Sequence, residues 1–211
     1  MGHESSRQVV PRTWRVSEQG ECVAAVAAEF APFRLDGSLD LPLSSDHLIP
    51  LLQFNAFRAT LTNIMILSVA HLVPSRCDIT EALRVTPLFN LPSTPPPSLR
   101  PTALQQSVPH ESWIDLLPDP TMRDNAIRFM HTYSGRDICG DMLGHLEQGR
   151  NTIEMTGVIV WGNPWEVDSW EVTEGFLKRW GFLFKGCYGA MAATNYWREQ
   201  RGDEPLVFEI Q

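Results

Sequence analysis

Four tryptophans and four acidic residues share one stretch of twenty residues, WGNPWEVDSWEVTEGFLKRW, near the C-terminal end of the sequence. A guanidinium group stacks on aromatic rings and donates paired hydrogen bonds to a carboxylate, so this composition favours a guanidinium site. Glu166 is the central candidate, because it stands between Trp165 and Trp170 and helix capping does not explain it. The guanidinium could belong to a bound ligand or to Arg198 of the same chain, and the sequence leaves both alternatives open.

A second set of candidate residues lies in the segment KGCYGAMAATNYW. Thr194 and Asn195 interrupt an apolar helix, and a buried amide needs several hydrogen bonds, so Asn195 is a candidate for either a functional or a structural role. Cys187, close to Lys185, could act as a nucleophile, but a lone cysteine between helices is more often a small buried apolar residue.

Composition excludes several classes of function. The 211 residues carry a formal net charge of −8 and a pI near 5.2, which argues against a DNA-reading module because the molecule as a whole repels polyanions. The sequence has no phosphate-binding glycine loop, no nucleophilic serine elbow and no zinc-binding helix motif, and its four cysteines lack metal-ligand spacing. The N-terminus has no apolar signal segment. We therefore expect a cytoplasmic protein with reduced thiols, no metal and no cofactor.

The fold that must position these residues is predicted to be mainly α. We expect an N-terminal arm over residues 1–43 and a single compact helical domain over 44–211, with one short two-stranded β element. Apolar spacing predicts a long central helix over 46–73, whose polar residues interrupt every window long enough to span a membrane. Residues 86–110 hold seven of the sixteen prolines and predict a long irregular loop.

The shorter elements are predicted from caps, breakers and periodicity. In the first half they are a helix over 78–85, a helix from Pro120 to about 133 that is capped by Asp119 and ended by Gly135, and a further helix closed by Gly149. A strand over 156–161 follows, and residues 205–210 could pair with it. The last two elements are a helix over 169–184, with Asp168 and Glu171 as its N-cap and N3 residues, and a helix over 188–200 stopped by Gly202.

Four blocks of the sequence together resemble a fungal domain of unknown function that commonly follows a basic-zipper region in fungal regulators. The blocks, within residues 40–208, are LLQFNAFRATLTN, SWIDLLPDPTMRDNAIR, GVIVWGNPWEVDSWEVTEGFLKRWGFLFKGC and TNYWREQRGDEPL. No basic region or leucine heptad precedes them here, so we expect the DNA-binding half to be missing. Stand-alone proteins of this kind are similar to arginine-containing cyclodipeptide synthases, which condense arginine and a second amino acid from aminoacyl-tRNAs.

The resemblance implies a diketopiperazine product of fungal secondary metabolism and a site that binds a guanidinium and places an α-amine on an ester carbonyl. Aminoacyl esters are already activated, so this chemistry needs no ATP site. The expected substrate-binding residues are Glu166 and Asp115 for the guanidinium, Trp161, Trp165 and Trp170 as pocket walls, and Asn55.

The expected chemistry falls to three residues: Glu171 as general base, with Thr194 and Asn195 positioning the oxyanion or amide. Cys187 and Thr194 are the nucleophiles to test for a covalent intermediate. The tRNA would rest on the local excess of positive charge formed by Lys178, Arg179, Lys185, Arg198 and Arg201.

A rival class stays open, namely a non-catalytic ligand-sensing or interaction domain of a basic-zipper regulator without its DNA-binding half. An enzyme would turn over charged tRNA, whereas a sensor would show only a ligand-dependent melting shift.

Overall fold

The computed structural model describes residues 45–72, 79–143 and 157–208. The predicted N-terminal arm and the predicted helix stop at Gly149 lie outside these residues. The described elements are α2 Ser45–Leu67, η1 Ala70–Leu72, α3 Ile79–Val85, η2 Pro97–Leu99, α4 Ala103–Ser107, η3 Ser112–Leu116, α5 Pro120–Arg128, α6 Gly135–Met142, β1 Val158–Val160, η4 Val167–Ser169, β2 Trp170–Val172, α7 Glu174–Trp180, η5 Gly181–Phe184 and α8 Tyr188–Gln200. The prediction of a mainly α fold with one small two-stranded sheet is confirmed.

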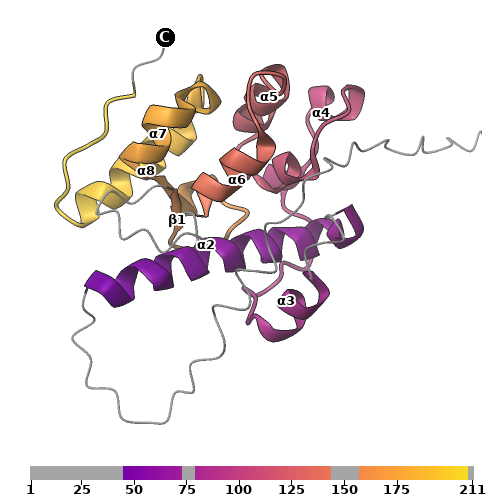
Figure 1. Cartoon of the computed structure of the whole chain (residues 1–211), viewed down its shortest axis with the longest axis horizontal. Helices are drawn as coiled ribbons and strands as arrows, with labels where there is room; N and C mark the ends of the chain where they lie inside the picture. The colour runs from indigo at the N-terminus through magenta and orange to yellow at the C-terminus, as the bar shows by residue number, and fades with distance from the viewer. Residues whose placement is uncertain (1–44, 73–78, 144–156, 209–211) are drawn as a thin grey trace, which may run out of the picture.

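The long helix α2 crosses the molecule, with α3 on one side and α5 to α8 on the other (Figure 1). Its buried face carries Phe57, Leu61 and Ile64, which form one apolar cluster with residues of α3 and η3. The side-chain amide of Asn63, a fully buried residue of this helix, finds two acceptors inside the fold. Asn63 donates to the carbonyls of Leu116 and Pro164, at 2.9 and 3.0 Å.

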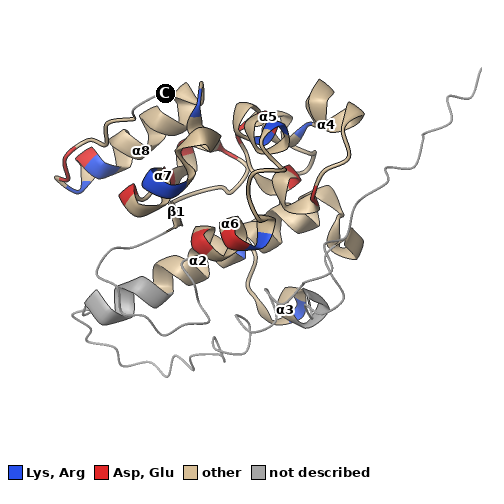
Figure 2. Ribbon diagram, turned by 45° about the horizontal axis from the view of Figure 1, so that its top comes forward, with Lys and Arg blue, Asp and Glu red and all other residues tan. Residues whose placement is uncertain are grey.

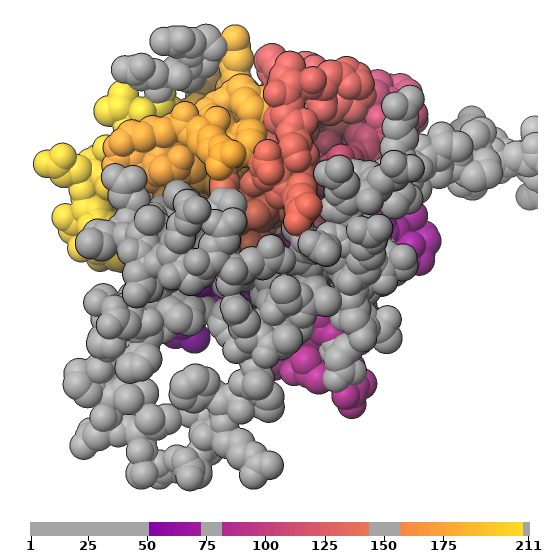
Figure 3. All heavy atoms as spheres, viewed as in Figure 1, coloured from indigo at the N-terminus to yellow at the C-terminus, as the bar shows by residue number. Residues whose placement is uncertain are grey.

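A larger apolar cluster lies between α5, α6, α7, η5 and α8. Ile127, Ile138, Phe176 and Leu183 are buried in it. Val158 of β1 packs against both clusters, so the small sheet joins the α2 layer to the rest of the helices. Figure 3 shows the segment from β1 to the C-terminal described residues, in orange and yellow, as one continuous surface beside α5 and α6.

The two-stranded sheet corrects two predictions. β1 pairs antiparallel with β2, in the register Val158 with Val172 and Ile159 with Glu171, so the partner of the predicted strand is not the segment 205–210. Residues 170–172 are therefore strand and not helix. The helix begins at Glu174, and Thr173, not Asp168, is its N-cap. Aromatic and β-branched residues favour a half-buried strand at this place over a helical turn.

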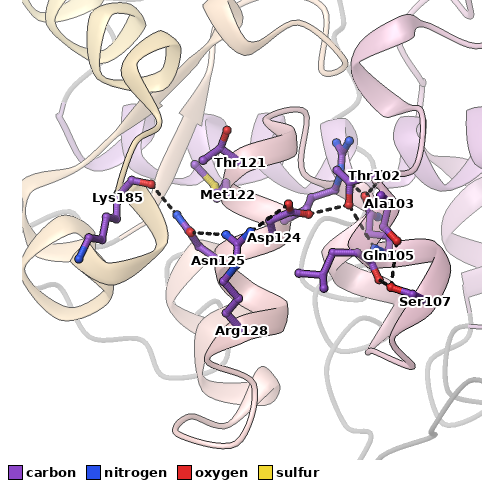
Figure 4. A network of polar contacts seen from close by, with 12 residues as sticks. Thr102, Ala103, Gln105, Ser107, Thr121, Met122, Asp124, Asn125, Arg128 and Lys185 are labelled. Carbon is purple, nitrogen blue, oxygen red and sulfur yellow. Dashed lines mark hydrogen bonds and ion pairs between the residues drawn. The ribbon is translucent and has the colours of Figure 1, made fainter.

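The proline-rich segment is irregular as predicted, but it contains the short helix α4, which the sequence analysis missed. Thr102 and Gln105 form its capping box, in which each side chain bonds the backbone N–H of the other. The Thr102 hydroxyl donates to Asp124 at 2.6 Å and so ties this segment to α5 (Figure 4). The amide of Asn125, also in α5, donates to the backbone carbonyl of Lys185 at 2.7 Å.

The ends of three helices follow from named caps. Asp119 caps α5 as predicted, accepting from the N–H groups of Thr121 and Met122, but α5 stops at Arg128 and not near 133. Ser134 caps the start of α6, where its side chain accepts from the N–H of Asp137. The chain leaves α8 through Gly202, whose φ of 77° is the left-handed conformation that glycine adopts most readily.

Candidate functional site

The candidate site is centred on Glu171, the middle residue of β2. Pairing of β2 with β1 fixes its backbone, and its side chain is only 2% exposed. A carboxylate buried to this extent is stable only when cationic or polar donors satisfy it. The donors around Glu171 therefore define what the site recognises.

Those donors are a guanidinium and an indole. Arg201 donates through Nη1 to Oε2 of Glu171 at 2.5 Å and through Nη2 to Oε1 at 2.7 Å, which is a two-pronged fork. Trp161 Nε1 donates to Oε2 at 2.8 Å. Charge-assisted forks of this kind are among the stronger hydrogen-bonding arrangements in proteins and fix the plane of the guanidinium.

Aromatic rings form the outer wall of the same site. Trp161 and Trp197 stack with centroids 5.4 Å apart and planes 22° from parallel. The Arg201 guanidinium carbon lies 5.3 Å from the Trp161 centroid, within cation–π range. We call Trp161, Glu171 and Trp197 the Glu171 site, and Arg201 is the group that fills it.

The electrostatics of the site favour a permanent cation. Hydrogen bonding to Glu171 raises the pKa of Arg201 above its usual value, and the Asp203 carboxylate, 2.9 Å from Nη2, adds to the effect. Both oxygens of Glu171 are already bonded to N–H groups, so neither is directed at a substrate amine in this arrangement. In this arrangement Glu171 accepts a guanidinium, and its role as general base stays a prediction.

The carboxylate expected to hold the guanidinium lies elsewhere. Glu166 is exposed, and among the described residues its carboxylate accepts from the side-chain amide of Asn163 at 3.2 Å. Arg198, its expected internal partner, donates instead to the Glu204 carbonyl at 2.6 Å. A carboxylate–guanidinium pair among tryptophans does exist, but its members are Glu171 and Arg201.

The other predicted pocket residues are divided between the site and the core. Trp170 donates to the Pro164 carbonyl at 2.9 Å, and the carbonyl of Trp165 accepts from Ser98. Asn55 donates to the carbonyl of Val160 at 3.0 Å and so fastens α2 to β1. These contacts hold the hairpin in place. Among the predicted pocket residues, only Trp161 contacts the guanidinium of Arg201.

Asp115 belongs to a separate buried network. Its Oδ1 accepts from the Gln105 amide and lies 3.1 Å from His110 Nε2. Gln105 also accepts from Nε of Arg123, a side chain with no exposed surface. Burial lowers the pKa of Arg123, an effect opposed by the carboxylates of Asp115 and its neighbours. The network holds the proline-rich segment to α5, and no spacing of residues along the chain reveals it.

Thr194 and Asn195 bond backbone groups on two sides of α8. The Thr194 hydroxyl, in a residue 1% exposed, accepts from the N–H of Val172 at 3.1 Å and so ties α8 to β2. Asn195 accepts from the N–H of Leu206 at 2.8 Å and donates to its carbonyl at 3.2 Å. Both side chains hold neighbouring segments in place, and their role in positioning an oxyanion or amide stays a prediction.

A small apolar cavity lies behind the Glu171 site. Its volume of about 30 Å³ has room for a water-sized group and not for an amino acid. Trp170, Glu171 and Thr194 line it, together with apolar side chains such as Met122 and Phe184. Three predicted site residues therefore do meet at one place, on the inner side of β2.

Cys187, one of the two candidate nucleophiles, has a buried thiol of low reactivity. Cys187 is 1% exposed, and burial, together with the carboxylate of Asp119, raises the pKa of its thiol well above the usual range. A neutral thiol of this kind is a poor nucleophile.

The five basic residues expected to bind tRNA lie on α7, between η5 and α8, and at the C-terminal end of α8. Lys178 and Arg179 lie on α7. Lys178 pairs with Glu174 at 2.9 Å, and Arg179 pairs with Asp141 of α6 at 2.7 Å. Arg198 and Arg201 lie at the far end of α8, where Figure 2 shows basic and acidic segments side by side. Lys185 is exposed, with its ammonium directed away from Asn125 in Figure 4.

Two further tests of the described residues concern metals and membranes. Within the ranges given above, no group of three or more histidine, cysteine or acidic side chains has a metal-binding arrangement. None of the helices so described is both long and apolar enough to cross a membrane.

Sequence comparison then places the chain. Residues 82–192, more than half of the chain, match the family described as domain of unknown function DUF3425. The chain belongs to this family. No curated protein and no solved structure matches it. The DUF3425 match contains Trp161 and Glu171, whereas Trp197 and Arg201 follow it.

Proposed function

We propose that this DUF3425 protein is an arginine-containing cyclodipeptide synthase, which condenses arginine and a second amino acid from aminoacyl-tRNAs. The single observation that supports the proposal most is the Glu171 site. A carboxylate that is 2% exposed accepts a bidentate guanidinium beside two stacked indoles. Such a site distinguishes arginine from lysine, because an ammonium cannot reach both oxygens with parallel N–H groups.

The reaction is two aminolysis steps. The α-amine of one aminoacyl-tRNA attacks the ester carbonyl of the other, which forms an amide and releases the 3′-hydroxyl of one tRNA. The amine of the second residue then attacks the remaining ester, closes the six-membered ring and releases the second tRNA. Each amine loses one proton, and each departing ribose oxygen gains one. An α-amine has a pKa of about 8, so a substantial fraction is neutral near neutral pH without a dedicated base.

The role of this chain's residues is then positional. Glu171 and Trp161 would hold the arginine side chain and so bring its amine and ester to a fixed place on the hairpin. With a net charge of −8, contacts to tRNA would be few and strongly salt-dependent, and Lys185 is one of the exposed basic residues that could make one.

Mass spectrometry of small molecules from a heterologous host that expresses the protein tests this function. The expected result is a cyclic dipeptide containing arginine, absent from the host alone. In a purified reaction with arginine, amino acids, synthetases and tRNA, ribonuclease should abolish the product. Equal product with and without ribonuclease would remove the tRNA-dependent mechanism.

A second candidate function is an arginine-sensing domain, as in a basic-zipper regulator without its DNA-binding half. Burial of Cys187 and Thr194 favours it, because neither predicted nucleophile is accessible. The sensor predicts an arginine-dependent melting shift with no product under any pairing of amino acids, whereas the synthase predicts both.

A further inference from the structure

Arg201 fills the Glu171 site from the edge of the fold. It is the C-cap residue that follows the last residue of α8, and its side chain is 34% exposed. Helix ends fray more readily than helix interiors. Glu171, by contrast, lies in a strand paired on one side with β1 and packed against α8. The acceptor is therefore fixed by the fold, whereas the occupant is attached at a helix terminus.

Few polar contacts hold the segment that continues from Arg201. In Figure 1 this yellow segment turns back beside the helices after α8. Its described hydrogen bonds to α8 side chains are the pair between Asn195 and Leu206 and the bond from Arg198 to the Glu204 carbonyl. Release of the Arg201 side chain breaks its bonds to Glu171, to the Asp203 carboxylate and to the Trp197 carbonyl. It breaks none of the three bonds above, nor the backbone bond from the Asp203 N–H to the Arg198 carbonyl, so the segment keeps these ties to α8.

We infer that Arg201 is an internal stand-in for a ligand, and that Glu171, Trp161 and Trp197 form a binding site for an external guanidinium-bearing molecule. The inference rests on the proposed function in naming arginine as that molecule. Binding is an exchange of one guanidinium for another on the same two oxygens, so the charge of the site is unchanged. The exposed third of the Arg201 side chain marks the side from which the ligand enters.

Removal of the internal occupant should expose the site to a free ligand. In the Arg201→Ala variant, arginine should raise the melting temperature saturably by several degrees, and lysine at equal ionic strength should not. The wild-type protein should need at least tenfold more arginine, because a tethered group competes at an effective concentration on the order of millimolar. Arg198→Ala is the matched control, since Arg198 lies on the same helix end and does not contact Glu171.

The double variant Glu171→Gln with Arg201→Ala should lose the response to arginine. A folded Arg201→Ala protein that melts identically in arginine and in lysine would overturn the inference.

A titration of the wild-type protein covers the case in which Arg201→Ala does not fold. The indole N–H resonance of Trp161, assigned by its loss in Trp161→Phe, should shift with arginine and not with lysine, because this N–H bonds Glu171. No shift at saturating arginine would also overturn the inference. An arginine response without any cyclic product would support the binding site and refute the synthase. Cyclic product with no arginine response in either experiment would support the synthase and overturn the inference about the site.

Discussion

Replacement of Glu171 by glutamine should destabilise the protein strongly, although the two side chains have nearly the same shape. The glutamine amide group must face either the guanidinium of Arg201 or the indole N–H of Trp161, and all three of these groups are hydrogen-bond donors. The variant therefore loses the charge and at least one of the three hydrogen bonds, and it leaves a donor without an acceptor.

The size of the effect follows from the exposure of the two partners. Hydrogen bonds to charged groups contribute about 1.5–3 kcal/mol each. Water can solvate the released guanidinium, because the Arg201 side chain is 34% exposed. The loss in stability is therefore smaller than the summed free energy of two such hydrogen bonds. We expect a loss of about 2–3 kcal/mol in the free energy of unfolding, or roughly 5–10 °C in melting temperature for a chain of this size.

Glu166→Gln is the matched control, five residues away in the same tryptophan-rich stretch. Its carboxylate is exposed and bonds only the Asn163 amide among the described contacts, so the change in unfolding free energy should stay within about 0.5 kcal/mol. Calorimetry or circular dichroism melting of both variants beside the parent gives the comparison. A Glu171→Gln protein that melts with the parent, or a Glu166→Gln protein that melts lower than Glu171→Gln, would refute the assignment of the guanidinium to Glu171.

Three further predictions concern the rest of the fold. Arg123→Ala should lower the free energy of unfolding by about 3–5 kcal/mol, because it leaves several buried acceptors unpaired. Arg128→Ala on the same helix should change this free energy little, and urea denaturation of both variants measures the difference. Burial raises the pKa of Cys187 and of Tyr133 in the folded state. The free energy of unfolding should therefore keep the full contribution of these groups at neutral pH and fall as the pH rises past about 8.5 and then about 10, where the unfolded thiol and phenol ionise; melting of Cys187→Ala should lose the first part of this slope. Asn195→Ala should speed amide exchange in residues 203–208 without a comparable effect in α2, because both its hydrogen bonds go to the C-terminal segment.

The helices could largely be predicted from the sequence because their signals are local. Asp119 followed by Pro120 placed the start of α5, and Gly202 placed the end of α8. The strand β2 was missed for a physical reason. Asp168 and Glu171 have the spacing of helix caps, and only pairing with β1, which is a contact between segments distant in sequence, makes residues 170–172 a strand.

The carboxylate and guanidinium that pair among the tryptophans, Glu171 and Arg201, are not the pair named from the sequence. Interleaved tryptophans and carboxylates favoured a carboxylate that holds a guanidinium, but the register of the hairpin decides which carboxylate lies beside Trp161. In that register Ile159 is opposite Glu171, which brings Trp161, two residues after Ile159 and just past the end of β1, close enough to bond it. Arg201 comes from beyond α8, thirty residues after Glu171, and no local spacing connects the two.

The reconstituted reaction, run with the two glutamate variants, tests the central claim most directly. Purified protein is given arginyl-tRNA and a set of second aminoacyl-tRNAs, below the melting temperature of every variant, and the cyclic product is quantified by mass spectrometry. The account predicts a cyclic arginine dipeptide from the parent and from Glu166→Gln, and at least about tenfold less from Glu171→Gln, since loss of a charged hydrogen-bonded partner costs about 1.4 kcal/mol or more. No product from the folded parent under any pairing, or equal product from Glu171→Gln and Glu166→Gln, would contradict it.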